Sequence, residues 1–218
     1  MKELALEFSF KARYYQSGEL NSATQQVWFV IHGYGHLAKY FIKKFEALSM
    51  RNVCVIAPEG LSRFYLEDIE KRVVTGNNRV GATWMTAENR LMDIDNYLTY
   101  LDEVHRQVLK NNPTLPVTIL GFSQGAATAS RWALHNKVNY ERLIIWAGIF
   151  PPDMDFKKGN EVLSRKELAI VYGTKDPYIN DKRLEEMQAL TDKLGLNPPV
   201  TTFKGGHEID EPTLLNFI

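Results

Sequence analysis

Six short apolar runs, separated by stretches with helical spacing, constrain the fold of this 218-residue chain more than any other feature. Each run is apolar without polar alternation, which is typical of strands that are buried on both faces. Strands that alternate with helices favour an α/β fold with a mostly parallel central sheet and helices on both faces. The predicted strands lie at residues 27–33, 52–60, 116–121, 142–148, 167–173 and 200–206.

Three of the intervening segments predict helices. Residues 38–49 have helical spacing between the first two strands. In residues 87–111 apolar residues recur at three- and four-residue steps, which predicts a long helix with a core-facing stripe that includes Leu91. Residues 181–194 predict a further amphipathic helix that ends at Gly195.

Two segments break this rhythm. Residues 4–15 alternate apolar and polar side chains, which predicts an antiparallel hairpin at the N-terminal edge of the sheet. Residues 61–84 are polar and aromatic without a clear period, so they predict a loop excursion or a small cap. This segment is a candidate lid, dimer surface or long loop on a single domain that spans residues 1–218.

Composition and charge exclude several classes of protein. The 26 basic and 26 acidic residues give a formal net charge of zero, so no global field favours nucleic acid or an anionic membrane. Cys54 is the only cysteine and has apolar neighbours, which is typical of a buried strand residue. No segment approaches the ~18 uninterrupted apolar residues of a membrane span, and Glu3 and Glu7 interrupt the N-terminal segment. We therefore expect a cytoplasmic protein without stable membrane insertion, and the sequence leaves a homodimer open.

The sequence Gly121-Phe122-Ser123-Gln124-Gly125 follows a predicted strand and precedes an alanine-rich helix. This is the setting of a nucleophile elbow, in which small flanking residues permit a sharp turn that exposes the serine hydroxyl. The N–H groups at the start of the helix then point to negative charge that develops beside the serine. The pattern also fits an idle serine in a tight turn, so other parts of the chain must supply a base and an acid.

A serine hydroxyl needs a general base in contact, and the chain offers five histidines. His105 and His135 lie within or at the end of predicted helices, and His36 opens another. His32 and His207 each follow a predicted strand beside glycines. Two glycines let the loop of His207 bend over the edge of the sheet, so we expect His207 to be the base.

The base needs a carboxylate that fixes its tautomer. Asp176 follows a predicted strand and its glycine, at the sheet edge where sites in open α/β folds gather. Asp153 and Asp155, which follow the preceding strand, are alternatives. Glu208 is disfavoured, because side chains of adjacent residues seldom converge on one imidazole. With Asp176, the chain order is serine, aspartate, histidine, as in α/β-hydrolases.

An oxyanion hole needs preorganised N–H donors. The glycine-flanked turn at residues 32–35 follows an early strand, so we assign the backbone N–H groups of Tyr34 and Gln124 as the two donors. His32 is then a structural residue that holds this turn by hydrogen bonds. His32 and His36 also have the spacing of a helical metal-ligand pair, but the intervening glycines disfavour a helix and no further ligand accompanies them. We therefore expect no metal at these residues.

Four motifs together resemble a known family: HGYG at residues 32–35, GFSQG at 121–125, YGTKDP at 172–177 and GGH at 205–207. They are similar to those of the phospholipase/carboxylesterase family of α/β-hydrolases, which includes the acyl-protein thioesterases. The resemblance implies the α/β-hydrolase fold, hydrolysis of esters or thioesters, and no cofactor. It also implies a triad of Ser123, Asp176 and His207.

Some residues depart from the family pattern. Ala126 occupies a position that is commonly glycine, and His36 occupies one that is often acidic. The excursion at residues 61–84 differs from the short loop of the thioesterases. This difference in the excursion favours a carboxylesterase for esters with small or short-to-medium acyl groups. The alternatives are a thioesterase or lysophospholipase acting on acylated protein or lipid, a serine peptidase, and a non-catalytic hydrolase-like binding protein. Candidates for an acyl pocket are Trp84, Phe122, Ile149, Phe150 and Tyr178.

Overall fold

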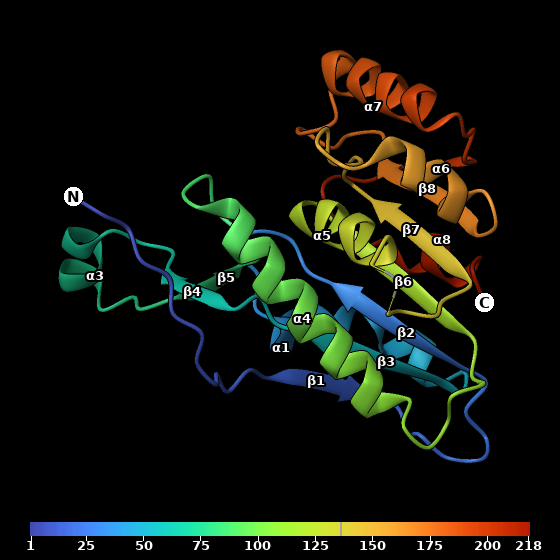
Figure 1. Cartoon of the computed structure of the whole chain (residues 1–218), viewed down its shortest axis with the longest axis horizontal. Coiled ribbons are helices and arrows are strands. Elements are labelled where there is room, and N and C mark those ends of the chain that lie inside the picture. Colours follow the sequence, from blue (N-terminus) through green and yellow to red (C-terminus); the bar gives the residue numbers. More distant parts are fainter. Residues whose placement is uncertain (136) are drawn as a thin grey trace.

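The central sheet has the order β1-β3-β2-β6-β7-β8-β9 (Figure 1). The structure is a computed structural model that describes residues 1–135 and 137–218. Within those residues β1 pairs antiparallel with β3, and every other pair in this sheet is parallel. The strands are β1 (Tyr14–Ser17), β2 (Gln26–Ile31), β3 (Val53–Pro58), β6 (Val117–Phe122), β7 (Arg142–Trp146), β8 (Glu167–Gly173) and β9 (Val200–Phe203). The expected α/β fold with a mostly parallel sheet is confirmed.

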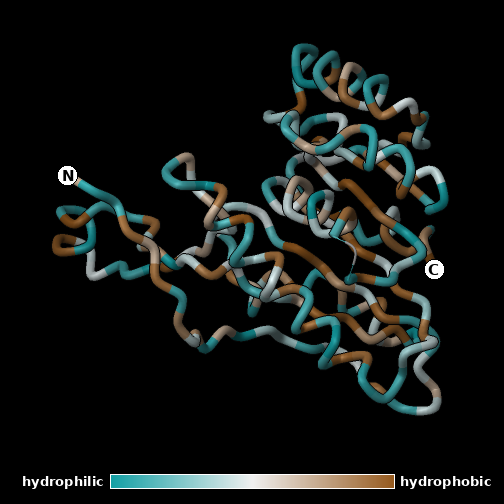
Figure 2. The backbone as a smooth tube through the Cα atoms, viewed as in Figure 1, coloured by the Kyte–Doolittle hydropathy of each residue, from teal (hydrophilic) through white to brown (hydrophobic). Residues whose placement is uncertain are grey.

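Helices cover both faces of the sheet, each over its own apolar cluster. Figure 2 shows hydrophobic residues along the central strands, where these two clusters meet the sheet. One face carries α4 (Arg90–Val108), α5 (Gln124–Ala133), α6 (Phe156–Leu163) and α7 (Asp181–Leu194). The other carries α1 (Ala38–Phe41), the 3₁₀ helix η1 (Ile42–Phe45), α2 (Glu46–Ser49) and α8 (Glu211–Leu215).

The strand order places a topological switch point at the centre of the sheet. β2 lies between β3 and β6, so the chain winds outward from β2 in opposite directions. The segment after β2 leads to α1 on one face, whereas the segment after β6 leads to α5 on the other. The crevice between the carboxyl ends of two such strands is where open α/β sheets bind ligands. The loop after β2 and the elbow after β6 therefore meet at the expected place.

The N-terminal segment forms the predicted antiparallel edge but not the predicted hairpin. β1 begins at Tyr14 and pairs antiparallel with β3. Residues 1–13 form no strand that could complete a hairpin with β1. The alternating side chains before β1, including Leu6 and Phe8, are exposed and belong to no strand.

Two predicted helical segments also need correction. Residues 38–49 form three short helical pieces, α1, η1 and α2, instead of one continuous helix. In α4 the buried stripe runs from Tyr97 to Val108, while Leu91 is 69% exposed. Leu91 is exposed because the first turn of α4 extends past the sheet (Figure 1). The apolar periodicity predicts the helix, but it does not show where the helix leaves the core.

The excursion at residues 61–84 contains secondary structure of its own. β4 (Ser62–Tyr65) and β5 (Val80–Thr83) form an antiparallel ribbon, and α3 (Ile69–Thr75) lies between them. Asp68 caps α3 by accepting a hydrogen bond from Lys71 N, and Gly76 ends it in the left-handed conformation. Figure 1 shows this unit projecting from one end of the sheet. Among the described helices, none is both long and apolar enough to cross a membrane.

Candidate active site

Ser123 occupies the turn between β6 and α5 in a backbone conformation that is rare for a residue with a side chain. Its φ of 55° and ψ of −118° lie outside the regions that ordinary residues adopt. The turn is tight because a Cβ at Gly121 would lie 2.6 Å from Ala126 Cα. A Cβ at Gly125 would lie 2.6 Å from the carbonyl oxygen of His32. Both glycines of the motif are therefore needed for close backbone packing around Ser123.

His207 and Asp176 contact one another beside this turn. His207 Nδ1 lies 2.7 Å from Asp176 Oδ2, and the Asp176 side chain is 0% exposed. Asp176 Oδ1 accepts a hydrogen bond of 2.9 Å from Tyr178 N, so both carboxylate oxygens have donors. Because Nδ1 faces a carboxylate, it carries the proton, and Nε2 is left as the acceptor. His207 is thus oriented as a base.

Glycines allow the backbones of the Asp176 loop and the His207 loop to approach each other closely. Lys175 N donates to Gly205 O at 2.9 Å, so the Asp176 loop and the His207 loop lie side by side. A Cβ at Gly173 would collide with the carbonyl oxygens of Gly205 and Gly206. This close approach accounts for glycine at the end of β8.

The alternative acids have other partners. Asp153 binds Arg131 Nη2 and Arg90 Nη2, each at 2.7 Å. Asp155 caps α6 by accepting from Lys158 N at 3.0 Å. Glu208 is exposed, and its carboxylate accepts from Gly206 N. Of the four carboxylates that the sequence offered, Asp176 is the one in contact with the His207 ring.

The loop after β2 lies against the elbow. A Cβ at Gly33 would lie 3.1 Å from Ser123 Cβ, so this loop passes directly beside the serine. Within residues 1–135 and 137–218, the backbone N–H groups of Tyr34 and Gln124 donate to no protein acceptor. They are the two donors that the sequence assigned to an oxyanion hole. The Tyr34 side chain itself is exposed and contacts Phe64 of β4.

A cavity of about 670 Å³ contains both Ser123 and His207 in its lining. Three of the five apolar candidates, Ile149, Phe150 and Tyr178, also line it. The other two lie elsewhere: Phe122 is buried against the His207 ring, and Trp84 is buried beneath the loop after β2. No hydrogen bond joins Ser123 Oγ to His207 in the described part of the chain. Such bonds often tighten only when substrate is bound.

A comparison with protein-family models identifies the family of this chain. The model of the family described as serine hydrolase (FSH1) matches residues 22–215. The chain belongs to this serine hydrolase family. A search of curated proteins gave no significant match.

Solved structures with the same fold include esterases, at low sequence identity. Esterase PE8 has a TM-score of 0.68 at 18% identity, with 95% of this chain and 96% of PE8 covered. Acyl-protein thioesterase 2 of Zea mays has a TM-score of 0.68 at 17% identity, with the same coverage. The Bacillus cereus carboxylesterase has a TM-score of 0.63 at 16% identity and covers 94% of this chain and 91% of its own. The α/β-hydrolase fold of this serine hydrolase is thereby confirmed.

The Gln124 side chain has a role in this serine hydrolase that sequence reasoning missed. Its Oε1 accepts a hydrogen bond of 3.2 Å from Trp84 N, and its Nε2 donates to Met85 O at 3.0 Å. The side chain thus fixes the end of the β4–β5 excursion to the elbow. No local signal could have revealed this, since the partners are about 40 residues away in the chain.

His32 is fully buried and holds the loop that carries Tyr34. Its Nδ1 lies 2.8 Å from Gly33 O, and its Nε2 accepts a hydrogen bond of 2.9 Å from Gly60 N. These two partners fix a neutral ring with the proton on Nδ1. His32 O also accepts from Trp84 Nε1 at 2.9 Å, so the loop is held from both sides.

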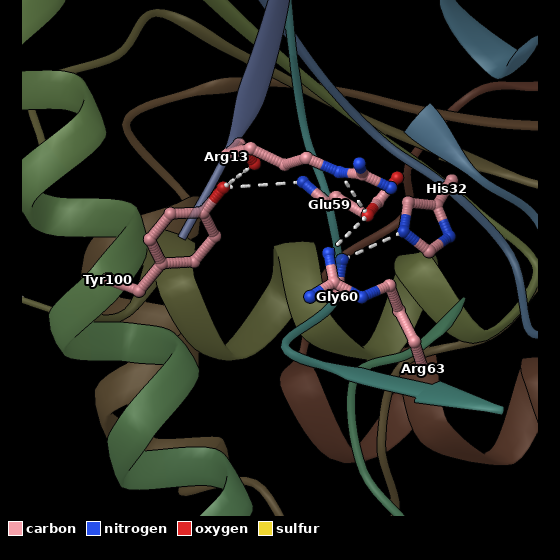
Figure 3. Close-up of polar contacts among 6 residues, drawn as sticks. All are labelled: Arg13, His32, Glu59, Gly60, Arg63 and Tyr100. Carbon is pink, nitrogen blue, oxygen red and sulfur yellow. Dashed lines mark hydrogen bonds and ion pairs between the residues drawn. The ribbon is translucent and has the colours of Figure 1, made fainter. Parts of the chain in front are cut away.

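Glu59, the residue after β3, is the centre of a polar cluster next to Gly60, the residue that donates to His32. Figure 3 shows its carboxylate between Arg13 and Arg63, whose nitrogens lie 2.7 and 3.4 Å from Glu59 Oε1. The Glu59 side chain is only 2% exposed. Tyr100 Oη accepts from Glu59 N at 3.3 Å and donates to Arg13 O at 2.6 Å. The cluster thus joins the residue before β1, the residue after β3, β4 and α4.

The buried His32 makes the stability of this serine hydrolase depend on pH. Burial lowers the pKa of His32 from 6.5 to about 4. Between these values the unfolded chain binds a proton that the folded chain excludes, so the free energy of unfolding falls as pH falls. Between pH 7 and 4.5 we expect His32 to contribute about 2 kcal/mol of this fall. Urea titrations at both pH values measure the free energy of unfolding, and it should fall by about 2 kcal/mol less in His32→Gln than in wild type. Equal falls in the two proteins would contradict the prediction.

Proposed function

We propose that the chain is a serine esterase that hydrolyses carboxylic esters through an acyl-enzyme on Ser123. One observation carries the proposal: Ser123 shares a cavity with His207, whose Nδ1 lies 2.7 Å from the buried Asp176. A serine nucleophile needs a base within reach, and the base needs a carboxylate that fixes its tautomer. Membership of the serine hydrolase family supports the assignment.

The reaction has two steps. His207 Nε2 takes the proton of Ser123 Oγ as the oxygen attacks the ester carbonyl, and the N–H groups of Tyr34 and Gln124 stabilise the oxyanion. His207 then gives that proton to the leaving alcohol as the bond between carbonyl carbon and alcohol oxygen breaks. Water attacks the acyl-enzyme by the same route, which releases the carboxylic acid and restores Ser123.

The cavity favours esters with small or short-to-medium acyl groups over lipids. Beside Ile149 and Phe150, its lining includes the charged side chains of Arg131 and Asp153. A long alkyl chain would remove these charges from water and leave the guanidinium donors that Asp153 does not bind without an acceptor, which is costly. This argues against the lysophospholipase alternative.

A fluorophosphonate probe tests the proposal directly. Because the probe forms a covalent bond with an activated serine, we expect wild-type protein to be labelled on the peptide that contains Ser123 and Ser123→Ala to remain unlabelled. The exposed Ser164 offers a matched control, and Ser164→Ala should be labelled like wild type. Mass spectrometry of the tryptic peptides identifies the adduct. Labelling of Ser123→Ala equal to that of wild type would rule out Ser123 as the nucleophile.

A further inference from the structure

The cavity at Ser123 has a local surplus of positive charge. The chain as a whole has a formal net charge of zero. The described residues that line this cavity nevertheless include more basic than acidic side chains: Arg90, Arg131, Lys182 and Arg183 against Asp153 and Glu186. A concave site lined by one sign of charge concentrates ligands of the opposite sign.

Two of these arginines share a single carboxylate. Arg131 Nη2 contacts Asp153 Oδ1 at 2.7 Å, and Arg90 Nη2 contacts Asp153 Oδ2 at 2.7 Å. The Arg131 side chain is only 10% exposed, so solvent screens its charge poorly. Two guanidinium charges against one carboxylate leave one positive charge unbalanced at the cavity wall.

The same arginines have hydrogen-bond donors to spare. A guanidinium carries five N–H groups, and Asp153 contacts one nitrogen of each arginine. Arg131 Nη1 lies 3.8 Å from Met85 Sδ, which is a weak acceptor. A carboxylate is the partner that guanidinium donors match in charge and geometry. Arg131 and Arg90 can therefore bind a second carboxylate beside that of Asp153.

Arg131 is placed to act on a substrate bound at Ser123. Gln124, Ala127 and Arg131 all line the cavity, and their spacing of three and seven residues puts them on one face of α5. The helical rise places the Arg131 Cα about 10 Å from that of Gln124 along the axis. Side chains in a helix lean toward its N-terminus, which brings the guanidinium back toward the elbow. This separation suits a substrate with a charge at the far end of a short chain.

A second cavity is also lined by basic side chains. It has a volume of about 570 Å³ and includes Lys44 and Arg79 but no acidic side chain among the described residues of its lining. His36, which lines it, stacks on Phe122, and Phe122 in turn packs on the His207 ring. This second cavity, which is linked to His207 through the rings of His36 and Phe122, thus also favours anions over cations.

From these contacts we infer that the ester substrate carries a carboxylate, which Arg131 and Arg90 bind inside the cavity at Ser123. The inference rests on the proposed esterase function and names the class of its substrate. Asp153 holds the two guanidinium groups in place and competes with the substrate carboxylate for their donors. The carboxylate can belong to the acyl group or to the alcohol, and the experiment separates these sources.

The test compares esters that have the same ester bond and leaving-group position and differ at one end, where one carries a carboxylate and the other a neutral group. For the acyl side the pair is mono-p-nitrophenyl adipate and p-nitrophenyl hexanoate; for the alcohol side it is para-butyryloxybenzoate and para-butyryloxybenzamide. The measured quantity is the ratio of kcat/KM for the anionic ester to that for the neutral one. A ratio taken on one preparation does not depend on how much of the protein is correctly folded.

Two variants should move this ratio in opposite directions. Arg131→Gln removes a charged donor, so the ratio should fall at least about tenfold in the pair whose carboxylate reaches the cavity. Asp153→Asn removes the competing charge, so the ratio should rise severalfold in the same pair. Arg106→Gln, at the exposed far end of α4, is the control for net charge and should leave both ratios unchanged.

The outcomes are separable. A ratio that stays constant in both variants and both pairs would overturn the inference and leave Arg90, Asp153 and Arg131 as a structural bridge between α4, α5 and the loop after β7. Hydrolysis of the neutral esters in that case would still support the esterase itself. If wild-type protein hydrolyses none of the four esters and does not react with the fluorophosphonate, both proposals are overturned.

Discussion

Asp176→Asn is expected to lower kcat for a short p-nitrophenyl ester by about 10⁴-fold while the protein stays folded. The reason lies in the two donors that face this side chain. Tyr178 N donates to Asp176 Oδ1 at 2.9 Å, and His207 Nδ1 lies 2.7 Å from Oδ2. An amide has one oxygen, and the backbone N–H of Tyr178 holds it. The amide NH₂ is then turned toward His207.

An NH₂ group that faces Nδ1 forces the wrong tautomer on His207. Nδ1 must then accept, so the ring proton moves to Nε2, which can no longer take the proton of Ser123. Asp155→Asn is the matched control, because Asp155 caps α6 and makes no contact with the His207 ring. We expect its kcat to stay within about twofold of wild type. An equal loss in both variants would contradict the assignment of Asp176.

Most of the central sheet could be predicted because its central strands are mostly apolar; β9, which was expected to be buried on both faces, is an edge strand with Val200 and Thr202 exposed. Residues 167–173 match β8, and residues 181–194 match α7, whose ends carry local signals in Asn180 and Gly195. The helices α6 and α8 were not predicted, because with eight and five residues they are too short for a clear period. The position of β1 was also missed, since its pairing with β3 depends on which edges the other strands leave free.

The backbone positions of the candidate site follow from the sequence, whereas its side-chain contacts do not. Ser123, Asp176 and His207 each follow a parallel strand, and the carboxyl ends of parallel strands lie at one edge of the sheet. The sequence left Asp153 open as the acid, because position along the chain alone does not exclude it. The contact with Arg90, 63 residues away, shows where that carboxylate lies. The positive lining of the cavity arises in the same way, from residues of separate elements.

Gly125, two residues after Ser123, is the position where we expect a substitution to have the largest effect on stability. In Gly125→Ala the new Cβ would collide with the carbonyl oxygen of Ile31 and lie 2.6 Å from that of His32. Ile31 is the last residue of β2 and His32 follows it; β2 pairs with β3 and β6, and Ile31 itself pairs with Gly121 of β6, so this backbone has little room to move away. Overpacking against side chains costs 1–3 kcal/mol, so a clash with fixed backbone should cost about 3 kcal/mol or more.

Gly206→Ala is the matched control for this prediction. A Cβ at Gly206 would meet nothing within 4 Å, so the same substitution there should change the free energy of unfolding by less than about 0.5 kcal/mol. Urea unfolding of the two variants and wild type measures the difference. If Gly125→Ala and Gly206→Ala unfold at the same urea concentration, the elbow is not packed against β2 as described. A large gap would show that the glycine serves the approach of α5 to the sheet, which holds Ser123 beside the loop of Tyr34.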